Sequence, residues 1–329
     1  MEAETGLKTQ RSGKFMPLML TAAGFIFLCM FSGAAADGAV RGLKVCAGVV
    51  VPSLFPFFVL SGVLNRLGLP EFFGRLAEPW ARRLFGVSGA GATAFVIGLC
   101  GGYPLGAVNV AQLYSWGDVD REEAQRLLAF CNNSGPAFLI GAAGTGVFGS
   151  GGWGLLLYIS HVLAAVTVGV IMRGKAGEGG RRERGSAVES LPAALSESVS
   201  TSVAGMVKVC GFVVFFAAVT GMLEASGAFA ALYGAMAARF GLELHWCRSL
   251  LTGLLELGGG IGAMQGLSAR PVNLALASFL IGWGGVSVHC QTMAALSGTG
   301  LSAARHTLGR LLCGIISAAY TFLASSVIF

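Results

Sequence analysis

Residues 128–146 read LAFCNNSGPAFLIGAAGTG and place a polar break inside an apolar segment. Three consecutive polar side chains, Asn132, Asn133 and Ser134, precede a Gly-Pro pair, which is typical of a turn. The flanking residues are apolar enough to lie inside a membrane. At that depth, non-helical backbone is tolerated only where protein or a watery cavity satisfies its polar groups. The stretch therefore predicts a broken membrane helix that lines a polar site.

The composition of the 329-residue chain indicates a helical membrane protein with many spans. Hydrophobic residues make up 54% and charged residues only 12%, whereas soluble domains carry about 25% charged residues. The net charge of +6 is expected to reside in cytoplasmic loops. Basic residues form no long stripe interleaved with aromatic residues, so nucleic-acid binding is not expected. We expect a multi-pass protein of the cell membrane, surrounded by lipid.

The N-terminal part, residues 1–43, combines a polar tail with an apolar run at 15–36. Small residues at 34–36 resemble a signal-peptide cleavage site. The alternative is a first transmembrane helix with a cytoplasmic N-terminus, which the length of the run favours.

Residues 44–172 form the first predicted membrane repeat. A span is expected at 44–67, and residues 68–87 combine arginine with aromatic residues as in an interfacial amphipathic helix. Residues 90–114 are split by Gly-Gly-Tyr-Pro at 101–104, which predicts a re-entrant hairpin. The broken segment follows, and then a span at 153–172.

The second predicted membrane repeat, residues 199–329, follows a basic loop at 173–198 that the positive-inside rule places in the cytoplasm. We expect its segments at 199–223 (a span), 226–245 (amphipathic), 250–267 (glycine-broken), 272–296 (a span) and 302–329 (a span).

Short matches in the same order relate the two halves. Phe57-Phe58 resembles Phe215-Phe216, the segment 97–107 resembles 252–263, and Gly144-Thr145-Gly146 resembles Gly298-Thr299-Gly300, all at a nearly constant separation. With a cytoplasmic N-terminus, the span at 44–67 and its counterpart cross the membrane in opposite directions. An inverted repeat with broken segments at matching positions is typical of secondary transporters, whose substrate site lies near the membrane midplane.

Four segments carry a family resemblance: SLFPFFVLSGVL (53–64), GLCGGYPLGA (98–107), LLAFCNNSGPAFLIGAAG (127–144) and SVHCQTMAAL (287–296). They resemble the YlbJ-like sporulation integral membrane proteins, which belong with the nucleoside-recognition (Gate) proteins. The resemblance implies an all-α fold like that of the concentrative nucleoside transporters, with two re-entrant hairpins and discontinuous transmembrane helices around a polar site. It also implies a role in forming the spore.

The candidate residues for binding a solute lie in the hairpin turns and helix breaks. They are Gly102, Tyr103, Asn132, Asn133, Ser134, Gly135, Glu256, His289 and Gln291.

Each candidate also has a structural alternative. The amides of Asn132 and Asn133 can cap a helix, Tyr103 can anchor at the interface, and His289 can simply be packed. Glu256 is an intramembrane acid and by default a functional candidate, but it can also pair with Lys208.

The chain shows no nucleophile–base pair, no phosphate-binding loop and no metal cluster, so an enzyme is not expected. Its eight cysteines contain no CxxC pair and predict neither disulfides nor a zinc site. Two functions remain open: a secondary-transporter-like carrier of a small polar or anionic solute in sporulation, or a non-transporting scaffold for spore-envelope assembly. The carrier needs no cofactor beyond a coupling Na⁺ or H⁺, and a homo-oligomer is left open.

Overall fold

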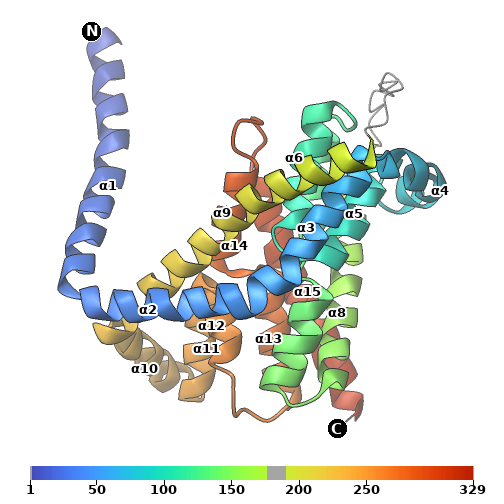
Figure 1. Cartoon of the computed structure of the whole chain (residues 1–329). Coiled ribbons are helices and arrows are strands. Elements are labelled where there is room, and N and C mark those ends of the chain that lie inside the picture. The colour runs from blue at the N-terminus through green and yellow to red at the C-terminus, as the bar shows by residue number, and fades with distance from the viewer. Residues whose placement is uncertain (1, 176–189, 329) are drawn as a thin grey trace.

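The computed structural model describes residues 2–175 and 190–328, and all regular structure in this part of the chain is helical (Figure 1). Most of the expected basic loop at 173–198 lies outside the described residues.

The first half contains α1 (Glu2–Met30), α2 (Ser32–Val45), the π-helical turn η1 (Cys46–Val50), α3 (Val51–Arg66), α4 (Leu69–Leu84), α5 (Gly89–Gly101), α6 (Leu105–Trp116), α7 (Arg121–Phe130), the π-helix η2 (Ala137–Val147) and α8 (Gly151–Ile171). The second half contains α9 (Leu191–Ala225), α10 (Ala228–Phe240), α11 (Leu244–Leu255), α12 (Leu257–Gly262), α13 (Pro271–Trp283), α14 (Gly285–Ala295) and α15 (Ala304–Ile328).

The first two expected spans are divided differently in the structure. The apolar run at 15–36 is not one helix, because α1 and α2 meet at 94° around Phe31. Helix α2 continues through η1 into α3, while α1 stands apart from the body (Figure 1). The bend lets α2 lie along α9. A Cβ on Gly38 or Gly42 would be only 2.8 Å from an α9 Cα atom, so the two helices pack backbone against backbone.

Both predicted hairpins are present. In the first, α5 and α6 are joined by a turn at 102–104, and Ser88 caps α5 by accepting a hydrogen bond from the Gly91 amide. In the second, α11 and α12 meet at Glu256, which caps α12. The amphipathic helix expected at 68–87 is α4, which meets the first hairpin at 91°.

Both predicted helix breaks are present as well, but the second precedes SVHCQ (287–291), where the sequence placed it, and these five residues lie inside α14. Helix α7 ends at Phe130, and regular helix resumes only at Ala137 in η2. The second break, between α13 and α14, lies at Gly284 and Gly285, whose φ angles are 83° and 78°. Side chains other than glycine rarely adopt such angles, so this pair fixes where the helix breaks.

The elements of the two halves follow the same order, and their last helices are antiparallel. Arg305 in the first turn of α15 pairs with Glu122 of α7 at 3.0 Å, while Arg126 of α7 donates to the carbonyl of Lys175, just after α8, at 2.6 Å. Helix α8 therefore ends where α15 begins. The expected all-α fold, with two hairpins and two discontinuous helices, is confirmed.

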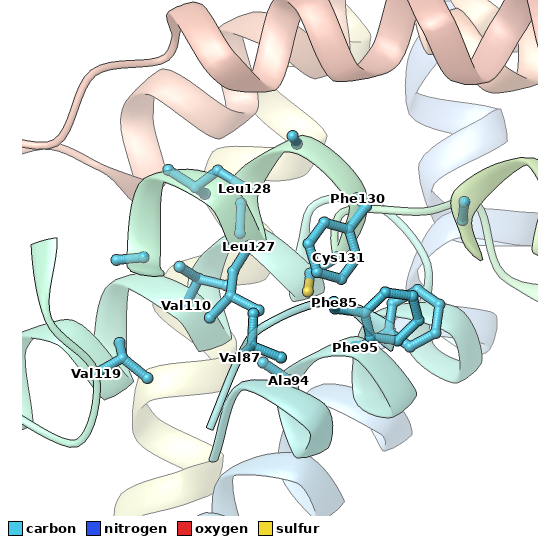
Figure 2. Close-up of a cluster of buried hydrophobic side chains, with 14 of the residues drawn as sticks. Phe85, Val87, Ala94, Phe95, Val110, Val119, Leu127, Leu128, Phe130 and Cys131 are labelled. Atoms are coloured by element: carbon cyan, nitrogen blue, oxygen red, sulfur yellow. The ribbon is translucent and has the colours of Figure 1, made fainter. Parts of the chain in front are cut away.

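An apolar cluster fixes the first hairpin to the first broken helix. The rings of Phe85, Phe95 and Phe130 contact one another, with centroids 5.2–5.5 Å apart. Figure 2 shows them beside Leu127 and Cys131, where α4, α5 and α7 converge. Burial of each such ring contributes about 1.5–3 kcal/mol. The end of α7, and with it the helix break, is thereby held against the hairpin.

The outer surface is suited to lipid. Four helices are long and apolar enough to cross a membrane, or six if each bent pair counts as one span, within the described residues. Large apolar side chains such as Val207 and Leu323 are exposed on them. Because such patches are rare on soluble monomers, the protein is a multi-pass membrane protein.

We predict that Gly98→Ala and Gly106→Ala each destabilise the fold. A Cβ at either position would collide with the carbonyl oxygen of Cys131, at the start of the first break. Overpacking of this kind costs about 1–3 kcal/mol, which a thermal unfolding assay in detergent detects as a lower Tm. The control is Gly141→Ala, where a Cβ meets nothing within 4 Å. Equal Tm values for all three variants would refute the close approach.

Candidate functional site

A fully buried arginine, Arg310 of α15, lies at the centre of the polar residues. Its Nη1 donates to the hydroxyl of Tyr103 and to Oδ1 of Asn133, both at 3.2 Å. Its Nη2 donates to the carbonyl of Ala129 at 3.0 Å, and its Nε has no hydrogen-bond partner among the described residues. The guanidinium therefore joins α15 to the first hairpin and the first helix break.

Tyr103, at the tip of the first hairpin, reaches the second half of the chain. Its hydroxyl donates to the carbonyl of Ile281 at 2.9 Å, within the last turn of α13. The same hydroxyl accepts from Arg310. Tyr103 is only 7% exposed, so it is a buried link between the halves and not an interfacial anchor.

Asn132 also connects the two halves. Its Oδ1 accepts from the Ala107 amide of α6 at 3.3 Å, and its Nδ2 donates to the Thr292 hydroxyl of α14 at 3.0 Å. Asn133 donates instead to the carbonyl of Phe130 at 2.7 Å. Both amides thus hold backbone or side chains around the break, and the Oδ1 of Asn133 is oriented toward Arg310.

Ser134 is positioned by a histidine that has no unused nitrogen. Its backbone amide donates to Nε2 of His161 at 3.2 Å, and Nδ1 of His161 lies 4.0 Å from the Cys313 sulfur. An imidazole nitrogen that accepts carries no proton, so His161 is the neutral Nδ1-protonated tautomer. Its role in the structure is to hold the break.

Each hairpin tip packs directly against the break of its own half. A Cβ on Gly102 would be 3.1 Å from the Gly135 nitrogen, and a Cβ on Gly135 would be 3.1 Å from the Gly102 nitrogen. In the second half, a Cβ on Gly285 would be 3.0 Å from the Leu255 carbonyl oxygen and 3.1 Å from the Leu257 nitrogen. The same backbone contact is therefore made twice.

Glu256 lies in the second of these contacts, but its carboxylate is directed to its own helix. Oε1 accepts from the Gly258 amide at 2.8 Å and Oε2 from the Gly259 amide at 2.5 Å. A carboxylate at a helix N-terminus is stabilised by these amides and by the helix dipole. Lys208 is exposed to the surroundings, and no ion pair joins it to Glu256 within the described residues.

His289 and Gln291, on α14, both lie beyond the second break. Gln291 donates to the Ser287 hydroxyl at 3.2 Å on the same helix. His289 is 8% exposed, and its ring contacts Trp283 with centroids 4.3 Å apart. It also meets the ring of His306 at 5.1 Å in an edge-to-face arrangement. His289 therefore lies between the second helix break and α15.

The structure thus brings Tyr103 and Asn133 together at Arg310 of α15 and places Ser134 against His161 of α8. The Glu256 carboxylate instead caps α12. The sequence analysis missed Arg310 and His306, which lie inside the last span. The sequence does contain a signal for Arg310, because a charged residue within a membrane segment is costly and is by default a functional candidate.

The described residues contain no group of three or more potential metal ligands. A cavity of about 480 Å³ lies between the links 241–246 and 266–273 and includes Trp246 and Arg270. None of the residues around Arg310 lines this cavity.

We predict that Tyr103→Phe weakens the link between the halves while keeping the ring. Removing the hydroxyl leaves the Ile281 carbonyl and one Arg310 donor unsatisfied, which costs about 1–3 kcal/mol. Thermal unfolding of the variant in detergent measures the loss. Tyr320→Phe is the control, since that hydroxyl bonds only to Thr167 and is half-buried. A Tyr103 variant as stable as the control would contradict the role of the hydroxyl.

Comparisons with known proteins found a family model, a relative and a solved structure that are similar to this chain. The model of the family "Gate: Nucleoside recognition" matches residues 47–172. The sporulation integral membrane protein YlbJ of Bacillus subtilis (strain 168) is 30% identical over 334 aligned residues, which cover 93% of this chain and 82% of that protein. The solved structure of a CNTnw variant in an outward-facing state covers 97% of this chain and 86% of its own, at 11% identity and a TM-score of 0.45. On the relation to YlbJ, the chain belongs to the family of YlbJ sporulation integral membrane proteins.

Proposed function

We propose that the protein is a secondary carrier that acts during sporulation and transports a small polar solute, specifically an anion. The sporulation role rests on the name of its Bacillus subtilis relative. The proposal includes no catalytic step and leaves Na⁺ or H⁺ as the coupling ion. Its site is the polar cluster around Arg310, where hairpin tips and helix breaks meet.

The observation that supports the proposal is the uncompensated charge of Arg310. Its side chain is fully buried, and within the described part of the chain no carboxylate bonds to it. A charged residue at the centre of a membrane helix costs about 2.5–3.5 kcal/mol on insertion scales. Neutral partners alone offset this cost poorly, whereas a bound anion neutralises the charge.

The chemistry of the cluster favours a carboxylate or a phosphate group. A guanidinium presents planar donors that match both groups, and charge-assisted hydrogen bonds are about twice as strong as neutral ones. The unpartnered Nε of Arg310 is available as a donor. The amides of Asn132 and Asn133 and the hydroxyl of Tyr103 are the additional polar groups proposed to orient the solute.

The way the hairpins are held supports alternating access as the transport mechanism. Each tip touches its helix break through backbone contacts of glycine residues, such as Gly102 with Gly135. These contacts contain few side chains that must be repacked when a hairpin moves. Rigid-body movement of one repeat against the other around a fixed site is the mechanism that inverted repeats favour. In the proposed cycle, the Tyr103 link to α13 is broken and remade.

We predict that Arg310→Gln reduces anion binding at least tenfold, because hydrogen bonds to a charged group contribute about 1.5–3 kcal/mol. Binding of acetate, succinate and inorganic phosphate is measured by calorimetry on the protein in lipid nanodiscs. Arg305→Gln, which removes an exposed ion pair with Glu122, is the matched control and keeps wild-type affinity. Uptake into proteoliposomes is expected to follow the same order.

Two results would contradict the proposal that the protein is a carrier. One is the absence of binding of all three anions to the wild type, and the other is equal affinity of the Arg310 and Arg305 variants. The scaffold alternative is separated by complementation of a sporulation defect. It requires that replacing residues 176–189 abolishes spore formation while Arg310→Gln, Asn132→Ala and Asn133→Ala leave it intact.

A further inference from the structure

Two buried imidazole rings lie side by side next to the proposed anion site. His289 of α14 and His306 of α15 meet with ring centroids 5.1 Å apart, and both are more than nine-tenths buried. Neither ring is part of the hydrogen-bond network around Arg310. Three ring nitrogens of this pair have no hydrogen-bond partner among the described residues: both of His289 and Nε2 of His306.

The tautomer of His306 follows from its single hydrogen bond. Its Nδ1 lies 3.2 Å from the carbonyl oxygen of Leu128. Because a carbonyl only accepts, Nδ1 carries the hydrogen, and in the neutral ring Nε2 is a free lone pair. An unpaired buried acceptor is costly, so this nitrogen can accept a hydrogen bond from a ligand, or take up a proton when a counter-charge arrives with it.

His289 is fixed in place without using either nitrogen. Its ring lies against Trp283, whose Nε1 donates to the carbonyl of Leu254 at 3.1 Å in the second hairpin. His306 in turn bonds to Leu128 of the first broken helix. The histidine pair therefore lies between the second hairpin and the first break, the elements that the proposed cycle moves.

Arg310 and the neighbouring imidazole are the charged and titratable groups that act on these rings within the described residues, and no carboxylate does. A proton on either ring would add a second positive charge beside the guanidinium. In the empty site, repulsion between the protonated ring and the guanidinium makes this unfavourable. An anion bound between the ring and the guanidinium attracts both charges and offsets much of that repulsion. Proton and anion binding are then coupled, and each raises the affinity for the other by the same factor.

We propose that His289 and His306 bind a proton together with the anion, so that the carrier is a proton–anion symporter. This rests on the proposed function. The proton adds to a free ring nitrogen, Nε2 of His306 or a nitrogen of His289, and the resulting N–H donates to the anion. His161 does not take part, since both of its nitrogens are occupied by Ser134 and Cys313.

The test measures protons taken up when an anion binds. Wild-type protein in nanodiscs is placed in weakly buffered solution with a pH indicator, and acetate, succinate or inorganic phosphate is added. The expected result is uptake of up to one proton per bound anion, and an affinity that rises up to tenfold for each unit by which the pH is lowered. The His289→Gln/His306→Gln variant is expected to lose most of the proton uptake and most of the pH dependence of the affinity.

His245→Gln is the matched control, because His245 is exposed at the start of α11 and lies outside the cluster. Differences between variants cancel any protonation of the probe itself. The single variants His289→Gln and His306→Gln, with Tm measured for each, show whether a loss reflects unfolding.

The outcomes separate this proposal from the one on which it rests. If none of the three anions binds the wild type, the anion site fails and the proton site fails with it. If an anion binds in an Arg310-dependent manner but no proton is taken up with it, only the symport proposal is overturned. The same holds if the folded double variant takes up as many protons as His245→Gln does. Loss of uptake in folded His289 or His306 variants supports it.

Discussion

The guanidinium of Arg310 is the contact on which the polar interior depends. It bonds to Tyr103 of the first hairpin, to Asn133 in the first break and to the carbonyl of Ala129 at the end of α7. That carbonyl is one of those that the end of a helix leaves without an intrahelical donor. One cation therefore stabilises the helix end and orders the break, and no carboxylate among the described residues bonds to it.

Close backbone contact explains why the breaks can be so polar and yet be buried. Glycine at 98 and 106 lets both arms of the first hairpin approach the Cys131 carbonyl, and Gly309 lets α15 approach Ala129 in the same way. Without side chains between them, little volume is left for lipid or stray water. The freed backbone groups are then satisfied by protein, which is the condition for breaking a helix at membrane depth.

The hydrophobic pattern and the positions of turn-forming residues were enough to predict the hairpins, the breaks and their repetition. This is because Gly, Pro and Asn determine the local backbone conformation. The bend between α1 and α2 was not predictable in this way, since it depends on glycine contacts with α9, far along the chain. Glu256 was identified as an intramembrane acid, yet it caps α12, because its own backbone is extended (φ −139°, ψ 118°) and its carboxylate accepts from the Gly258 and Gly259 amides. Arg310 was overlooked because it stands within an otherwise uninterrupted span.

The three histidines of the interior differ in what the fold leaves free. His161 uses both nitrogens to hold Ser134 and Cys313, so that protonation would break a contact of the helix break. His306 uses one nitrogen and His289 neither. A buried imidazole that is packed only by its faces can change its charge without dismantling the structure, provided that a counter-charge arrives with the proton. Under the proposed function, a single bound anion supplies this counter-charge and neutralises the charge of Arg310 as well.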